Sequence, residues 1–134
     1  MGHAERNHAL LGPSGAHRWM ECPPSARLEE QFPDTTSEAA REGTLAHELA
    51  EIKVRHYFYT PDFGKRKYTT RLNKLKKEDL WQDEMDRYTD EYLDYIKGAA
   101  LNLKSAPYVA IEQKLDLTTW IPEGFGTADC VMVY

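Results

Sequence analysis

The sequence predicts an α/β (α+β) fold in which a helix-rich N-terminal part is followed by two strands. Apolar residues recur at spacings of three and four over residues 37–58 and again over 79–104, which is the period of helices that face a core. After Pro107 the pattern changes to strand-like runs at 108–115 and 125–134. The chain has 134 residues, of which 41% are hydrophobic and 29% charged, so we expect one small globular domain over 1–134.

The N-terminal third is predicted to form a loose lead-in followed by short helices. Residues 1–13 are expected to be a flexible lead-in, and the mainly helical part is expected to run from 14 to 104. Ser14 and Ser25 can each cap a short helix. Prolines follow both segments and are expected to end these helices. Thr35 followed by Glu38 is a capping-box pattern, which predicts the start of the long helix over 37–58. Because this helix carries apolar residues on two sides, we expect a central helix packed on the first strands of the sheet.

The next segment, residues 65–77, is basic and has only Leu72 and Leu75 to bury, so it is predicted to be a loop or a poorly anchored helix. The aromatic stripe of the following helix indicates core packing rather than a ligand platform. The strand over 125–134 carries the apolar run to the end of the chain, and a sheet of two strands is marginal alone. We therefore expect another chain, a second copy or a missing C-terminal part to cover it.

Charge is segregated along the chain, although the net charge is only −5. Residues 53–77 carry nine basic side chains and one acid, and residues 78–94 carry eight acids and one arginine. The basic block favours contact with the phosphate backbone of DNA, but the two blocks could also neutralise each other within the fold. The candidate DNA-binding residues are Lys65, Arg66, Lys67, Arg71, Lys74, Lys76 and Lys77.

Several classes of protein are disfavoured by composition. The sequence has no run of 18 or more apolar residues, which a membrane-spanning helix requires. The N-terminus also lacks the apolar stretch of a signal peptide. Cys22 and Cys130 lie far apart, without the spacing of a disulfide framework or a zinc knuckle. We therefore expect a cytoplasmic protein without a membrane partner.

The residues that could carry chemistry lie in the long helix and the two strands. His47 and Glu51 are four apart and share one face of the helix, and Gly43, one turn earlier, indicates the close approach of another backbone or a ligand. Glu112 lies in the first strand. Asp129 lies within the apolar second strand, where an unpaired carboxylate is costly to bury. One imidazole and neighbouring carboxylates are suitable ligands for Mg²⁺ or Mn²⁺.

The order of these motifs resembles a known family. Arg18 and Trp19, then CPPSARL at 22–28, REGT at 41–44 and His47, are similar to the opening of phage-encoded members of the PD-(D/E)XK nuclease superfamily, in its RecB-like exonuclease branch. The resemblance covers residues 14–134. It implies a restriction-endonuclease-like mixed sheet and Mg²⁺- or Mn²⁺-dependent hydrolysis of DNA by a phage or prophage protein in a bacterial host.

The resemblance also assigns roles to individual residues. It implies that His47 is a metal ligand and that Asp129 is the strand acid that holds the catalytic metal. Glu51 or Glu112 would be a supporting carboxylate. The catalytic candidates are thus Asp129, Glu51 and Glu112, and the metal-ligand candidates are His47 and Asp129.

The sequence departs from the family pattern in two respects. In the family, the strand of Asp129 is followed by another strand with an acid-x-lysine motif, in which the lysine orients or activates the attacking water, and that following strand does not occur before Tyr134. We therefore expect an N-terminal fragment of a nuclease that is inactive alone. Some relatives hold an iron–sulfur cluster with four cysteines, and two cysteines do not support a cluster held by this chain alone.

Two alternatives remain open. One is a non-catalytic DNA- or protein-binding module that uses the basic segment 53–77, with His47 in a structural role. The other is a helical interaction protein whose strands complete the sheet of a dimer.

Overall fold

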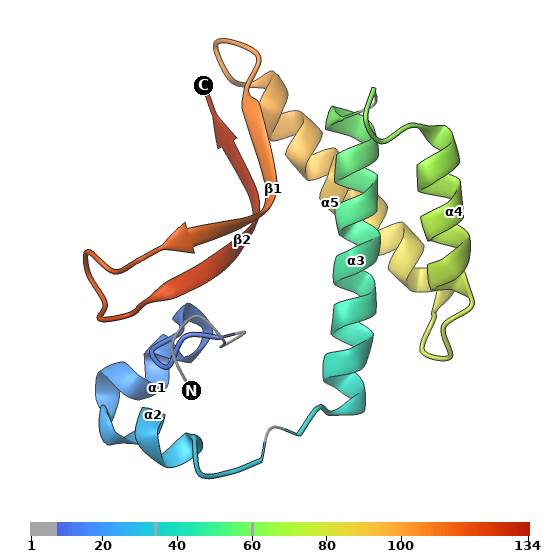
Figure 1. Cartoon of the computed structure of the whole chain (residues 1–134). Coiled ribbons are helices and arrows are strands. Elements are labelled where there is room, and N and C mark those ends of the chain that lie inside the picture. The colour runs from blue at the N-terminus through green and yellow to red at the C-terminus, as the bar shows by residue number, and fades with distance from the viewer. Residues whose placement is uncertain (1–7, 34, 60) are drawn as a thin grey trace. The chain divides into compact units, whose positions relative to one another are not determined.

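The computed structural model describes residues 8–33, 35–59 and 61–134, and it confirms the predicted α+β class. The helices are the 3₁₀ turn η2 (Pro13–Gly15), α1 (Ala16–Glu21), α2 (Pro24–Glu29), α3 (Glu38–Phe58), α4 (Lys65–Lys76) and α5 (Asp83–Leu101) (Figure 1). The strands β1 (Tyr108–Asp116) and β2 (Phe125–Val133) form a two-stranded antiparallel sheet.

The chain divides into two compact units, which are described separately. The first unit holds the chain up to Thr35 together with residues 112–128, and the second holds residues 36–111 together with 129–134. Residues 1–7 of the predicted lead-in lie outside the described residues. Among the described residues, no helix combines the length and the apolar composition that crossing a membrane requires.

In the first unit, the two short helices form where they were predicted, but with different caps. Gly15 precedes α1 and Pro23 precedes α2, and neither helix has a side-chain cap. The predicted capping roles of Ser14 and Ser25 are therefore wrong. Pro24 occupies the first turn of α2, where the missing proline N–H leaves no bond unmade.

The turn that joins β1 to β2 also lies in the first unit and depends on one glycine. Leu117 N–H donates to the carbonyl of Gly124 over 2.9 Å and closes the turn. A Cβ atom on Gly124 would lie 2.7 Å from the Cβ of Ile121, which is closer than real side chains approach. The turn therefore excludes any side chain at position 124.

The second unit is built on α3, whose predicted range is confirmed. The helix is capped by Ser37, whose Oγ accepts a hydrogen bond from the backbone N–H of Ala40 over 3.1 Å. The capping box predicted at Thr35 and Glu38 is therefore displaced, since the N-cap lies two residues after Thr35.

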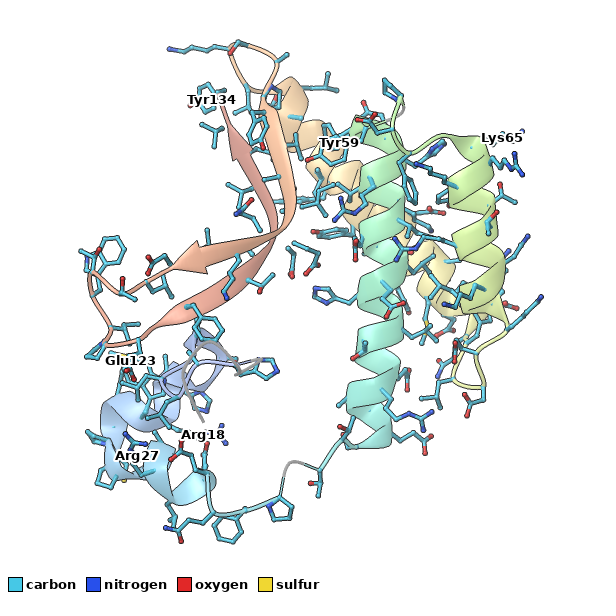
Figure 2. The ribbon with its side chains drawn as sticks, in the orientation of Figure 1. Arg18, Arg27, Tyr59, Lys65, Glu123 and Tyr134 are labelled. Atoms are coloured by element: carbon cyan, nitrogen blue, oxygen red, sulfur yellow. The ribbon has the colours of Figure 1, made fainter. Side chains whose placement is uncertain are left out.

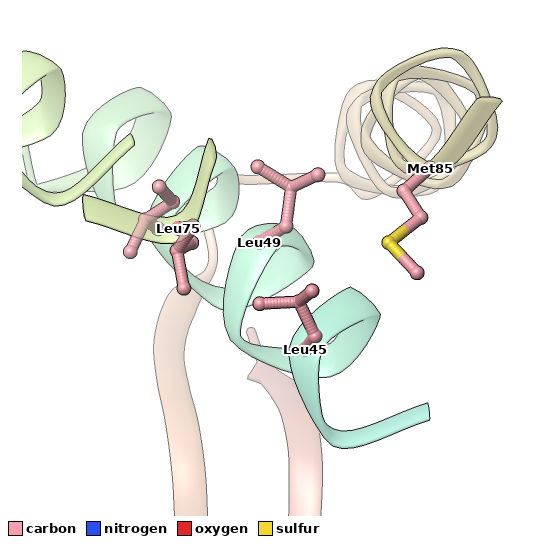
Figure 3. Close-up of a cluster of buried hydrophobic side chains, with 5 residues drawn as sticks. Leu45, Leu49, Leu75 and Met85 are labelled. Carbon is pink, nitrogen blue, oxygen red and sulfur yellow. The ribbon is translucent and has the colours of Figure 1, made fainter. Parts of the chain in front are cut away.

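The core of the second unit lies where α3 contacts α4 and α5. Its buried side chains are Leu45, Leu49 and Ile52 of α3, Leu75 of α4 and Met85 of α5 (Figure 3). The prediction of a loop or poorly anchored helix at 65–77 is corrected, because α4 is a regular 12-residue helix. Leu75 is buried, and Tyr68 and Leu72 pack against the same cluster, so the helix has three apolar anchors.

Lys53 links α3 to α5 through a buried ammonium group. The residue is only 4% exposed, yet its Nζ donates to Oδ1 of Asp86 over 2.7 Å and to Oδ1 of Asp90 over 2.6 Å. A third bond, also 2.7 Å long, reaches the backbone carbonyl of Asp86. All three donors of the ammonium are satisfied, which is the condition under which a buried charge is tolerated.

Side chains also connect α3 to the strands within the second unit. Tyr59, which follows the last residue of α3, donates a hydrogen bond from its hydroxyl to the carbonyl of Val109 in β1 (Figure 2). Burial raises the pKa of this tyrosine, so the hydroxyl keeps the proton that it donates. Val109 and Ala110 are themselves buried.

Candidate metal site

His47 and Asp129 meet in the second unit, as the family resemblance implied. His47 lies near the middle of α3 and Asp129 lies in β2, 82 positions further along the chain. The His47 Nε2 atom is 2.6 Å from Oδ1 of Asp129. Their side chains are 55% and 56% exposed, so the pair is open to solvent and to ions.

The pair offers one imidazole nitrogen and a carboxylate. These are donor types that Mn²⁺ accepts, and Mg²⁺ prefers the carboxylate oxygen. Two protein ligands leave most of the coordination sphere to water, which allows weak binding and a place for a phosphate oxygen. The same contact is also a simple hydrogen bond between histidine and aspartate.

Glu51, the second acid on the His47 side of the helix, has a different partner. Its Oε1 accepts a hydrogen bond from Nε of Arg55 over 2.8 Å, an ion pair within one turn of α3. The structure therefore directs the Glu51 carboxylate toward Arg55, and its supporting role stays a prediction.

Gly43 does not have the close backbone neighbour that was predicted, and the approach of a ligand stays a prediction. Apart from its chain neighbours and the adjacent backbone of α3, a Cβ atom built at this position meets no atom of the described residues within 4 Å. The expectation that another backbone requires a glycine here is therefore wrong.

Glu112, the remaining carboxylate, has an unusual backbone. It lies in β1, the strand hydrogen-bonded to the β2 strand of Asp129. Its φ angle of 53° falls in the left-handed region, which residues other than glycine rarely adopt. Strained residues of this kind cluster at functional sites, which favours a role for Glu112.

Replacing Glu112 by glycine is expected to stabilise the chain. Glycine has no Cβ penalty at positive φ, so we expect the free energy of unfolding to rise by about 1 kcal/mol in urea titrations. The control Glu112→Gln keeps the Cβ atom and should not show this gain. A loss of stability in Glu112→Gly would contradict the strained backbone.

The predicted DNA-binding residues lie along α4. Six of them are exposed and together define the α4 basic surface: Lys65, Arg66, Lys67, Lys74, Lys76 and Lys77 (Lys65 is labelled in Figure 2). Arg71, the seventh, is half-buried, and its guanidinium lies 5.9 Å from the centre of the Phe63 ring.

The acidic block pairs with one member of the basic block, Lys53, and among the described residues it forms no ion pair with the α4 basic surface. The acids of 78–94 that form ion pairs across helices do so with Lys53 and Arg41 of α3. Within the described ranges, none of the six side chains of the α4 basic surface forms an ion pair. The basic charges of α4 therefore remain available to a polyanion.

Both cysteines are free thiols in the structure. Cys22 is exposed, and Cys130 is half-buried beside Asp129 in β2. Burial raises the pKa of the Cys130 thiol, and the negative charge of Asp129 raises it further. Cys130 is therefore mainly a protonated thiol near neutral pH, which is the unreactive form.

Sequence reasoning did not predict a cavity of about 460 Å³ in the first unit. Trp19 and Phe125 line it, from α1 and from the start of β2. The glycines at 12, 15 and 126 were the available signal, because each also lines the cavity.

Comparison with known proteins places the chain in a family. The family described as "Protein of unknown function (DUF2800)" matches residues 8–134, so the chain belongs to it. No solved structure matches the chain.

Proposed function

We propose that this DUF2800 chain is the N-terminal part of a metal-dependent DNA exonuclease, in which His47 and Asp129 bind Mg²⁺ or Mn²⁺. The observation that carries the proposal is the 2.6 Å contact between these two exposed side chains, contributed by a helix and a strand. The resemblance of the sequence motifs to phage-type PD-(D/E)XK nucleases supplies the reaction class, phosphodiester hydrolysis.

The protein groups have separate tasks in this proposal. His47 and Asp129 hold and orient the ion from two elements of the second unit. When bound, the ion would stabilise charge on the phosphate and lower the pKa of water. Glu51 or Glu112 would be the supporting carboxylate, as the resemblance implies.

The α4 basic surface supplies the affinity for DNA in the proposal. Six exposed cations, five in α4 and Lys77 at its C-terminal cap, can replace counterions along a phosphate backbone, which gives binding without sequence preference.

The activity test follows from the missing acid-x-lysine motif. We expect the 134-residue chain to show little or no cleavage of DNA with Mg²⁺ or Mn²⁺, since the resemblance requires an acid-x-lysine motif in a strand that follows the strand of Asp129, and the 134 residues do not include such a strand. A longer version of the protein that supplies this strand should cleave DNA, and His47→Ala or Asp129→Ala should abolish the cleavage.

Two outcomes would contradict the nuclease proposal. Robust cleavage by the 134-residue chain itself would show that the chemistry lies elsewhere. A longer version that stays inert with both metals would favour the second candidate, a non-catalytic DNA-binding module. The observation that favours the module is the α4 basic surface, which carries no ion pair among the described residues.

A further inference from the structure

The cavity of the first unit has the size of a small-molecule site. Its volume of about 460 Å³ falls within the range of about 300–1,000 Å³ that is typical of ligand pockets. The described residues that line it come from the segment around η2, from α1 and α2, and from the start of β2.

The walls of the cavity are held in place by specific contacts. The indole Nε1 of Trp19 donates to the carbonyl of Gly12 over 2.9 Å, which fixes the orientation of the ring. A Cβ atom on Gly126 would lie 2.9 Å from Cγ of Pro13, so this wall requires a glycine. The cavity is therefore shaped by the fold of the first unit and does not depend on mobile side chains alone.

The chemistry of the lining favours a planar and largely uncharged group. Trp19 and Phe125 supply aromatic rings. Arg18 is the lining guanidinium (Figure 2), and its Nε lies 3.3 Å from Oε1 of Glu29, which also lines the cavity. Because these two charges compensate each other, the cavity does not select a strong anion.

A cation stands beside the aromatic lining. Nζ of Lys114 lies 4.6 Å from the centre of the Phe125 ring. A planar group against the Phe125 ring would therefore have a positive charge nearby for an attached phosphate.

We propose that this cavity binds the base of an unpaired nucleotide in single-stranded DNA. Aromatic faces stack on any base, so binding would tolerate every sequence. A base within a duplex is already stacked and paired and cannot enter without being flipped out. The choice of DNA among planar ligands rests on the proposed function, whereas the cavity itself does not.

Tryptophan indole signals in the NMR spectrum of the full chain give a direct test. The sequence has three tryptophans, and Trp19 alone among them lines the cavity. We expect a thymidine tetranucleotide to shift the Trp19 indole signal and to leave those of Trp81 and Trp120 in place. Trp120 is the internal control, because it is 77% exposed and belongs to the same unit. A long blunt-ended duplex, in which every base is paired, should not shift the Trp19 signal.

A matched pair of variants extends the test. Phe125→Leu keeps an apolar side chain but removes the ring, and we expect it to weaken tetranucleotide binding about tenfold. Trp120→Leu makes a comparable exchange outside the cavity and should bind as the unchanged chain does. Equal affinity in both variants would overturn the proposal, as would a bound tetranucleotide that leaves the Trp19 signal unmoved.

Failure here can be distinguished from failure of the proposed function. Mn²⁺ binding that depends on His47 and Asp129, together with an unresponsive Trp19, would overturn the nucleotide cavity alone. A shifted Trp19 signal without such metal binding would instead overturn the metal site alone.

Discussion

Removing both carboxylates that face Lys53, in the double variant Asp86→Ala/Asp90→Ala, is expected to lower the free energy of unfolding by about 3 kcal/mol. The ammonium would remain in a site where it is only 4% exposed, with one backbone carbonyl as its remaining partner. The expected loss lies at the low end for a broken buried pair, because Asp86 and Asp90 are themselves 46% and 63% exposed.

Two further variants make this prediction specific. Lys53→Met removes the charge with a side chain of similar length, so stability should stay within about 1 kcal/mol of the unchanged chain. Glu91→Ala/Asp94→Ala removes two exposed acids elsewhere on α5 and should have a smaller effect than the Asp86/Asp90 variant. Urea unfolding of all three variants measures the differences in the free energy of unfolding, provided that the slope of this free energy against urea concentration is the same for each variant. If the Asp86/Asp90 variant is no less stable than Lys53→Met, the buried ammonium does not need its carboxylates.

Neutralising part of the α4 basic surface is expected to weaken DNA binding at every sequence. In Lys74→Gln/Lys76→Gln, two phosphate contacts are lost, so the negative slope of log affinity against log salt should become less steep by about 2. Fluorescence anisotropy with labelled DNA over a series of salt concentrations measures both the affinity and the slope.

The matched control for this prediction is Lys97→Gln/Lys104→Gln. It removes the same charge from lysines that lie outside α4. A purely global charge effect would weaken DNA binding equally in both double variants. Equal weakening would therefore contradict the assignment of DNA binding to the α4 basic surface.

Helix and strand positions were predictable because the sequence pattern is local. The apolar spacing over 37–58 and the strand-like runs after Pro107 correspond to α3, β1 and β2 within a few residues. The stability of α4 was underestimated because only Leu72 and Leu75 were counted. Tyr68 also packs against the core, and its polar hydroxyl conceals the apolar ring from a simple pattern.

The burial of Lys53 was predictable from its position on α3, but counting the charges of residues 53–77 together concealed it. Lys53 lies four residues after Leu49, on the buried side of α3, and its two partners are also four residues apart on α5. Treating the basic block as one uniform segment grouped Lys53 with the exposed side chains of α4. A helical projection would have separated them.

The contact between His47 and Asp129 was predictable only from the order of the motifs. Nothing in the local sequence brings together residues that are 82 positions apart, and the family resemblance supplied that pairing. The bond between Glu51 and Arg55 and the left-handed backbone of Glu112 were not predicted. The first reflects a choice of side-chain partner, and the second depends on how the two strands pair.

The central claim is that His47 and Asp129 bind a divalent cation, and a Mn²⁺ titration followed by electron paramagnetic resonance tests it most directly. We predict weak binding that strengthens with rising pH, since the imidazole must lose its proton to bind a metal. His47→Ala and Asp129→Ala should each lower the affinity at least about tenfold, whereas His17→Ala and Asp94→Ala, at exposed positions elsewhere, should not change it. Equal Mn²⁺ affinity in the unchanged chain, His47→Ala and Asp129→Ala would contradict the claim.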